Sequence, residues 1–199
     1  MTTRAADRWL PLPVAIAIGA LLLLTTWLLF VEVNALGTGA RLTARLSFTF
    51  FIAAYWAQPL VRCLSRTESG ARRFARWLLA NRRWLGIGGA LSQGVHLAYV
   101  VGHQLAHSEP LDWVTLVFGG LGFVAFWVMG VTSNNTAVRR MGRDWSRLHS
   151  VSLHYLWFIF FITYLGRGLD PLYTSFTALL VGGLALRLIT RLPRFSRER

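Results

Sequence analysis

Long apolar runs, separated by short arginine-rich segments, dominate this sequence. Each run has close to the roughly 20 residues that an α-helix needs to cross ~30 Å of hydrocarbon. Because 54% of the 199 residues are hydrophobic and 15% are charged, a soluble domain would leave too much apolar surface in water. The prediction is an all-α, multi-pass membrane protein, with residues 1–199 forming one six-transmembrane-helix bundle. The expected spans are about 13–33, 45–62, 84–104, 111–131, 150–167 and 171–192.

The first run resembles a signal peptide, because Arg4 and Arg8 precede it and an Ala-Leu-Gly sequence at 35–37 follows it. Its apolar stretch, Val14 to Val31, is longer than a typical signal core of roughly 7–15 residues. We therefore expect a retained membrane helix.

The distribution of positive charge predicts the orientation of the chain. All 21 basic residues are arginine, and the formal net charge is +13. Arginines cluster between spans two and three, between spans four and five, and after span six, whereas the connection between spans three and four carries Glu109 and Asp112. The positive-inside rule places these clusters and both termini in the cytoplasm, with Arg41 and Arg45 as mild exceptions. Since topology explains the charge, nucleic-acid binding is not expected.

Residues 66–83 place Phe74, Trp77 and Leu78 among arginines. This pattern favours an interfacial helix that binds anionic membrane lipid. The alternative is a docking surface for a phosphate-bearing cofactor or a protein partner. In span three, a stripe of small residues predicts close packing against a neighbouring helix. Its members recur every four residues, at Gly86, Ala90, Gly94, Ala98 and Gly102.

Histidines carry the candidate chemistry of the chain. A single cysteine, Cys63, cannot form a thiolate cluster or an intramolecular disulfide, so any metal site must use histidine. Counted from Arg83, His96 lies roughly 20 Å into the membrane at 1.5 Å per residue. An ionisable residue at that depth is a functional candidate that needs a partner. A hydrogen-bonded core histidine is the alternative.

Four segments resemble the ferric-reductase-like transmembrane domain family, in particular the haem-binding membrane subunits of methionine sulfoxide reductase systems. They follow one another in the family's order and cover nearly the whole chain. These segments are GTGARLTARLSFTFFIAAYWAQPLVRCL, NRRWLGIGGALSQGVH, GVTSNNTAVRRMGRDWSRLH and DPLYTSFTALLVGGLALRL.

The resemblance implies a bundle that holds haem b between spans three and five and passes electrons across a bacterial inner membrane. Residue by residue, His96 and His149 match the family's axial ligands of the haem iron. The resemblance also implies a flavin such as FMN, or a quinone, as electron source. The implied partners are a periplasmic reductase subunit or a cytoplasmic flavin reductase. Whether the chain is itself an enzyme or the electron-transfer subunit of an oxidoreductase stays open.

The chain departs from the family at Ile162, where span five usually has a further histidine. By helical rise, Ile162 lies roughly 22 Å deep and level with His96, whereas His149 lies about 3 Å deep. We therefore expect Ile162 to face the core opposite His96. His154, at about 10 Å, is an alternative ligand. It has aromatic neighbours at helical spacing, Trp157, Phe158 and Phe161.

Two other functions follow from the sequence. The missing histidine favours a haem-free membrane anchor or assembly partner derived from the same family. A small transporter has weaker support, because no internal repeat, broken-helix pair or carboxylate within a span is recognisable.

Overall fold

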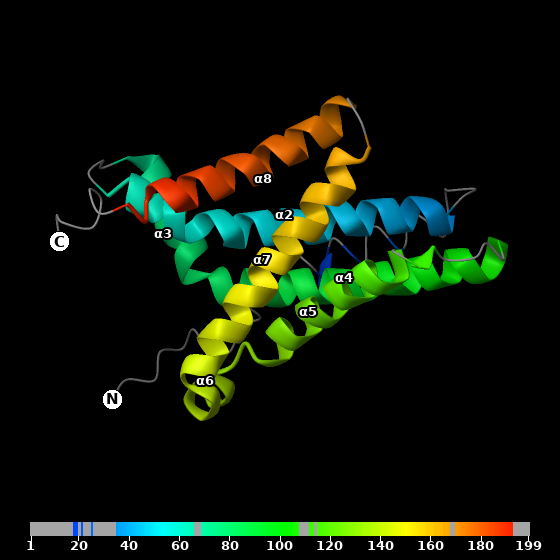
Figure 1. The fold of residues 1–199 in the computed structure, drawn as a ribbon, viewed down its shortest axis with the longest axis horizontal. Coiled ribbons are helices and arrows are strands. Elements are labelled where there is room, and N and C mark those ends of the chain that lie inside the picture. The colour runs from blue at the N-terminus through cyan, green and yellow to red at the C-terminus, as the bar shows by residue number, and fades with distance from the viewer. Residues whose placement is uncertain are drawn as a thin grey trace.

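The computed structural model describes residues 18–19, 21, 25, 35–65, 69–107, 112–113, 115–167 and 170–192. Within them every regular element is helical, so the all-α prediction is confirmed for this part of the chain. Apart from four single positions, the expected first span at 13–33 lies outside the described residues. The elements (Figure 1) are α2 (Ala35–Cys63), α3 (Gly70–Ala80), α4 (Arg82–His107), the π-helical turn η2 (Thr115–Gly119), α5 (Gly120–Val131), α6 (Asn135–Met141), α7 (Arg143–Leu165) and α8 (Pro171–Ile189).

Two of the described helices, α7 and α8, are long and apolar enough to cross a membrane. A third span is counted if η2–α5 and α6, which meet at 100°, form one broken span. The longer α2 and α4 have 29 and 26 residues, but polar side chains such as Arg41 and Arg45 in α2, and Gln93 and His96 in α4, lower their mean hydropathy. Large apolar side chains are exposed along the bundle, including Leu105 at 79%. These features are compatible with a membrane protein.

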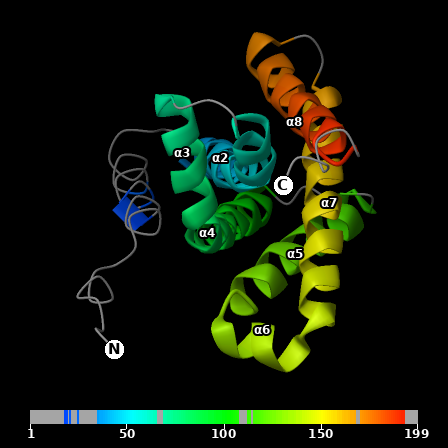
Figure 2. The same ribbon diagram turned by 90° about the vertical axis from the view of Figure 1, so that its left-hand side faces the viewer.

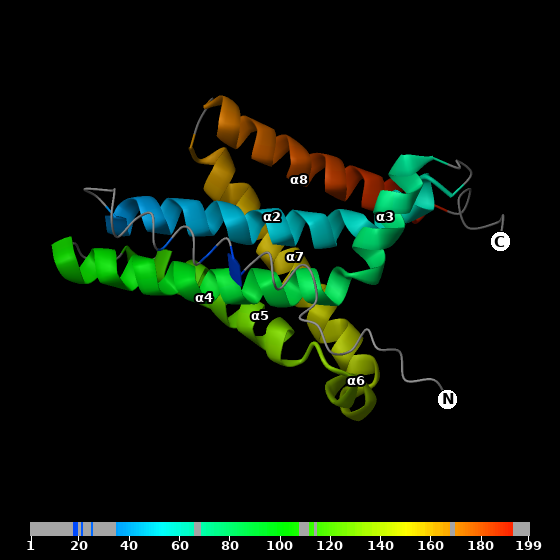
Figure 3. The same ribbon diagram turned by 180° about the vertical axis from the view of Figure 1, so that it is seen from behind.

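Helix α2 is the centre of the arrangement and packs against α3, α4 and α8. Helices α4 and α5, α5 and α7, and α7 and α8 also pack together. Figures 1 and 3 show α2 and α4 side by side, with α7 inclined to both. Seen along the bundle in Figure 2, α3 lies beside α2 and α4, and α6 lies away from them at the start of α7.

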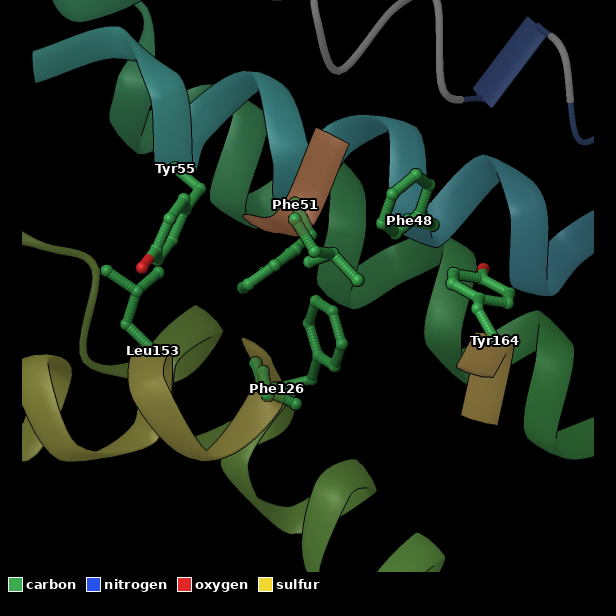
Figure 4. Packing of buried hydrophobic residues seen from close by; sticks show 8 residues of the cluster. Phe48, Phe51, Tyr55, Phe126, Leu153 and Tyr164 are labelled. Carbon is green, nitrogen blue, oxygen red and sulfur yellow. The ribbon is translucent and has the colours of Figure 1, made fainter. Parts of the chain in front are cut away.

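An aromatic core joins α2, α5, α7 and α8 (Figure 4). In it, the Phe48 ring meets the Tyr164 ring edge-on, with centroids 5.0 Å apart at 87°. The Phe160 ring lies 5.1 Å from Phe51 and 6.2 Å from Phe126. Edge-to-face and tilted arrangements match the positive edge of one ring to the negative face of another. The core therefore fixes the position of α7 relative to α2.

The seam between α2 and α4 is polar and tightly packed. Thr43, Ser47 and Ser92 are fully buried there. The Ser92 hydroxyl donates to the Thr43 carbonyl at 3.2 Å, and the Ser47 hydroxyl, which donates to the same carbonyl at 2.9 Å, lies 3.1 Å from Ser92 Oγ. Nearby, Gly39 packs so closely on the Tyr99 ring that a Cβ atom would overlap it. Buried hydroxyls that bond across helices hold such a seam together where lipid supplies no hydrophobic drive.

The small-residue stripe of α4 packs mainly against α5. An added Cβ at Gly94 would lie 3.1 Å from Trp127, and one at Gly130 would lie 2.9 Å from Ala90. Gly102 meets Leu36 of α2 in the same way, whereas a Cβ at Gly86 would meet nothing within 4 Å. The predicted close approach is confirmed at the middle of the stripe and fails at Gly86.

The expected helix between spans two and three is α3. Ser69 caps it by accepting a hydrogen bond from the Arg72 backbone N–H. Leu78 is buried in a second core cluster between α2, α3 and α4. Phe74 and Trp77 are exposed and stack with centroids 6.2 Å apart. Only these two aromatic residues are therefore available to an interface, and Leu78 instead docks α3.

Several boundaries differ from those expected. Helix α2 begins at Ala35 rather than at about 45, and α7 begins at Arg143 rather than at about 150. The arginine-rich segment before α7 also forms a short helix, α6. Asn134 caps α6 by accepting from the Ala137 N–H at 2.7 Å. The polar sequence is helical here because its caps and turn residues support it, without an apolar face.

Candidate functional site

A cavity of about 640 Å³ lies between α2, α4, η2–α5 and α7, and His96 is in its wall. We call it the His96 cavity. Its volume is in the range of small-molecule and cofactor sites, roughly 300–1,000 Å³. The lining is mostly apolar and includes Val100, Gly119, Phe123, Phe126, Leu156, Ile159 and Phe160. The π-helical turn η2 also lines it, and the Tyr155 hydroxyl fixes that turn by donating to the Phe118 carbonyl at 2.8 Å.

His96 is oriented by α2. Its Nδ1 lies 3.2 Å from Thr43 Oγ1, and that hydroxyl donates its single hydrogen to the Gly39 carbonyl at 2.6 Å. With the Thr43 hydrogen committed to that carbonyl, the hydroxyl oxygen accepts from His96 in the tautomer that carries its hydrogen on Nδ1, and this tautomer leaves the lone pair on Nε2. The imidazole ring stacks with Phe123, with centroids 5.7 Å apart.

Three arginines, Arg41, Arg45 and Arg167, line one end of the His96 cavity. Arg45 and Arg167 both donate to the Tyr173 hydroxyl, at 3.3 and 2.9 Å. Both guanidinium groups also lie over the Tyr173 ring, at 5.8 and 5.0 Å from its centroid. Among the described residues that line this cavity, none is acidic. The rim of the cavity is therefore positively charged. Arg41 and Arg45, the two exceptions to the positive-inside rule, belong to this rim.

The wall opposite His96 comes from α7. Leu156, Ile159, Phe160, Thr163 and Tyr164 line the cavity, and none of these is a metal-binding imidazole. These positions are spaced as one face of a helix.

Ile162 is absent from that lining and is 39% exposed. The expectation that Ile162 faces the core opposite His96 is therefore wrong. Counting helical rise gave its height along α7, but its angular position turns it outward. Thr163 is the neighbouring residue that does face the cavity.

His149 belongs to a different cavity. Its Nε2 lies 2.9 Å from Thr132 Oγ1, which donates to the Val128 carbonyl at 2.6 Å. In the tautomer with its hydrogen on Nε2, His149 donates to Thr132. The ring stacks on Trp145, with centroids 4.1 Å apart. The structure thus gives His149 a hydrogen-bonded position beside Arg82 and Arg83, which line the same cavity.

His154 lines neither cavity. Its Nδ1 donates to the Ser150 carbonyl one turn earlier, at 2.7 Å. Of its expected aromatic neighbours, Trp157 and Phe161 stack on each other with centroids 5.1 Å apart. The three predicted site residues, His96, His149 and His154, are therefore not brought together.

Several residues of the site were not predicted. Thr43 and Thr132 orient the two histidines, and neither spacing nor charge singles out a threonine in an apolar helix. Arg187 is different, because it is a charge inside the apolar run of span six, and that signal was available in the sequence. It is 93% buried, with 7% exposed, in the cavity that contains His149.

Within the described part of the chain, no three His, Cys, Asp or Glu side chains gather as a metal-binding group. A porphyrin needs only one or two axial side chains, so the relevant test is the fit of His96 and its cavity. No protein-family model matches this chain, and no solved structure matches it.

Proposed function

We propose that the protein is a six-span subunit of a bacterial inner membrane, with cytoplasmic termini, that binds haem b through His96 and passes electrons to a partner. One observation carries the proposal: an imidazole whose Nδ1 is hydrogen-bonded to Thr43 lines an apolar cavity of cofactor size. When Nδ1 donates to Thr43, Nε2 is left to bind a metal, in the way that hydrogen-bonded partners orient ligating histidines.

The charges at the rim fit the same ligand. Haem b is a flat apolar ring with two carboxylates on one edge. The apolar wall of α5 and α7 suits the ring, and Arg41, Arg45 and Arg167 suit the carboxylates. When bound, haem supplies one-electron redox chemistry. A flavin such as FMN, or a quinone, is the proposed electron source. A periplasmic reductase subunit or a cytoplasmic flavin reductase is the proposed partner.

An optical spectrum of the full chain tests this proposal. Protein purified in detergent from haem-replete cells is expected to show a Soret band and sharp b-type bands after dithionite. His96→Ala should abolish or greatly weaken these bands, because it removes the axial nitrogen. His154→Ala is the matched control, since His154 lies outside the cavity, and its spectrum should equal that of the wild type.

A wild-type spectrum without haem bands would contradict the proposal and favour the membrane anchor or assembly partner. If His154→Ala loses as much haem as His96→Ala does, the iron is bound at a different position, near His154 on α7.

A further inference from the structure

Several helix ends border a second cavity of about 500 Å³, which we call the basic pocket. Its wall includes the C-terminal half of α2, the beginning of α4, the end of α5, part of α6, the beginning of α7 and the end of α8. In Figure 1 these segments lie in the left half of the picture, with the beginning of α7 at the bottom, beside α6. Arg82, Arg83, Arg187 and Arg191 line the pocket, together with His149 and Asn135.

The positive charge of this pocket is uncompensated. None of the described residues in its wall is acidic. Arg82, Arg191 and Arg62 all lie close enough to Arg187 to repel it electrostatically. Burial lowers the pKa of the Arg82 guanidinium, as expected for a cation removed from water. Concentrating like charges in a half-enclosed site is unfavourable unless an anion enters it.

Arg187 shows that the pocket has an unmet hydrogen-bonding capacity. The side chain is only 7% exposed. One Nη donates to the Tyr55 carbonyl at 2.9 Å, and the guanidinium lies 4.2 Å from the centroid of the Tyr55 ring. Its Nε is buried and has no hydrogen-bond partner among the described residues. A buried charged donor without an acceptor is costly, so an acceptor from outside the chain is expected there.

The remaining contacts favour an oxyanion. Arg83 donates to Asn135 Oδ1 at 3.2 Å, which holds its guanidinium at the pocket. The hydroxyl groups of Ser146 and Ser150 are in the same wall. Several guanidinium forks together with hydroxyls match the tetrahedral oxygens of a phosphate group, because each fork can bind two oxygens.

We propose that the basic pocket binds a phosphate group, and that in the membrane the headgroup of an anionic phospholipid supplies it. The pocket lies at the ends of α7 and α8, the two described helices that qualify as membrane spans, where headgroups are located. The phosphate site is separate from the His96 cavity and does not depend on haem. A failed haem spectrum and a failed phosphate titration are therefore distinct results.

The experiment measures phosphate binding by the full chain in a neutral detergent. Inorganic phosphate, titrated at constant ionic strength with chloride, should raise the thermal unfolding midpoint of the wild type. In a second arm, protein in nanodiscs of phosphatidylglycerol and phosphatidylcholine is extracted, and the retained lipid is measured by mass spectrometry. Phosphatidylglycerol should be enriched over its share in the nanodisc.

Arg191→Gln and Arg82→Gln should each weaken phosphate affinity about tenfold, the typical effect of losing one charge-assisted hydrogen bond. Arg191 is exposed at the end of α8, so its loss does not threaten folding. Arg140→Gln is the matched control, since it removes the same charge from an exposed position of α6 outside the pocket.

If Arg191→Gln no longer retains phosphatidylglycerol and Arg140→Gln still does, the result supports the lipid as the source of the phosphate group. Phosphate binding without lipid enrichment would overturn the lipid source and leave a soluble phosphate compound. Equal losses in all three arginine variants, or no response of the wild type to either probe, would overturn the phosphate site itself.

Discussion

A single hydroxyl group, that of Thr43, orients the imidazole of His96. Thr43 is fully buried, donates to the carbonyl of Gly39 within its own helix, and so has only lone pairs to offer the imidazole. His149 stands in the same relation to Thr132, but with the other ring nitrogen bound. The two threonines thus meet different ring nitrogens, Nδ1 of His96 and Nε2 of His149. Of the two histidines, His96 is the one that lines the mostly apolar cavity.

A second ligand can be introduced from the α7 side of the His96 cavity. Because Thr163 lines the cavity, Thr163→His is expected to shift bound haem toward a low-spin, two-imidazole spectrum. Ile162→His is the control one position away, and its outward-facing side chain should leave the spectrum unchanged. Visible absorption and electron paramagnetic resonance report the spin state.

The reverse pattern, with Ile162→His active and Thr163→His silent, would show that α7 is rotated from the orientation described above.

Sequence reasoning identified His96 because an ionisable residue in an apolar run is conspicuous. It misplaced Ile162 because axial rise gives only depth, whereas the face of a helix is set by packing against its neighbours. The burial of Arg187 was missed for a related reason. Its acceptor is the Tyr55 carbonyl of α2, far away along the chain. The charge within an apolar run marks Arg187 in the sequence, but the identity of its acceptor depends on the tertiary arrangement.

At the scale of the elements, Gly142 joins α6 to α7 with a φ of 54° and a ψ of −118°. Side chains strongly disfavour this conformation, because a Cβ atom would crowd the adjacent peptide groups. The residue lets the chain turn directly from the last residue of α6 into the first residue of α7. The position of His149 therefore depends on this turn.

Gly142→Ala is expected to lower the free energy of unfolding by roughly 1–3 kcal/mol, the cost of a strained backbone conformation. Gly86→Ala, within α4, should instead raise it by roughly 0.5–1 kcal/mol, because alanine favours a helix interior. A Cβ at either position would meet no neighbouring atom within 4 Å, so steric clashes do not enter the comparison. Denaturant titration in mixed micelles, followed by circular dichroism, measures both changes. Equal effects at the two sites would contradict the backbone explanation.

The apolar runs predicted the existence of the described long helices, and the start of α8 agrees with the expected residue, Pro171. The early start of α2 was not predicted, because the expected span began at about 45 and Arg41 was placed in the connection before it. In the structure Arg41 lies on the helix and at the rim of a cavity. Length and apolarity thus predict a helix core, and specific contacts decide how far it extends.

At the scale of the whole molecule, the arginine-rich helix ends gather at one end of the bundle. The C-terminal half of α2, the end of α8, the beginning of α4 and the beginning of α7 all contribute to the basic pocket. This grouping places on one side the arginines that the charge pattern predicts to be cytoplasmic. The opposite end carries the His96 cavity rim, with Arg45, Arg167 and Tyr173.

The single cysteine provides a test of orientation. Cys63 is exposed at the end of α2, beside the arginine-rich end. A membrane-impermeant maleimide is expected to label it in inverted vesicles and not in right-side-out vesicles. A Cys63→Ser variant that also carries Leu105→Cys, at an exposed position near the end of α4, should show the opposite pattern. Labelling of Cys63 from outside the cell would contradict the proposed topology.

The aromatic core has a consequence for the entropy of binding at the His96 cavity. Phe126, Phe160 and Tyr164 line the cavity and also pack on one another or on Phe48. Their rotamers are therefore fixed before any ligand arrives. Ordering a free side chain on binding costs roughly 0.5–1.5 kcal/mol. A flat molecule that enters this cavity therefore contacts aromatic side chains that are already ordered. Less of its contact energy is spent on ordering them, so its affinity is higher.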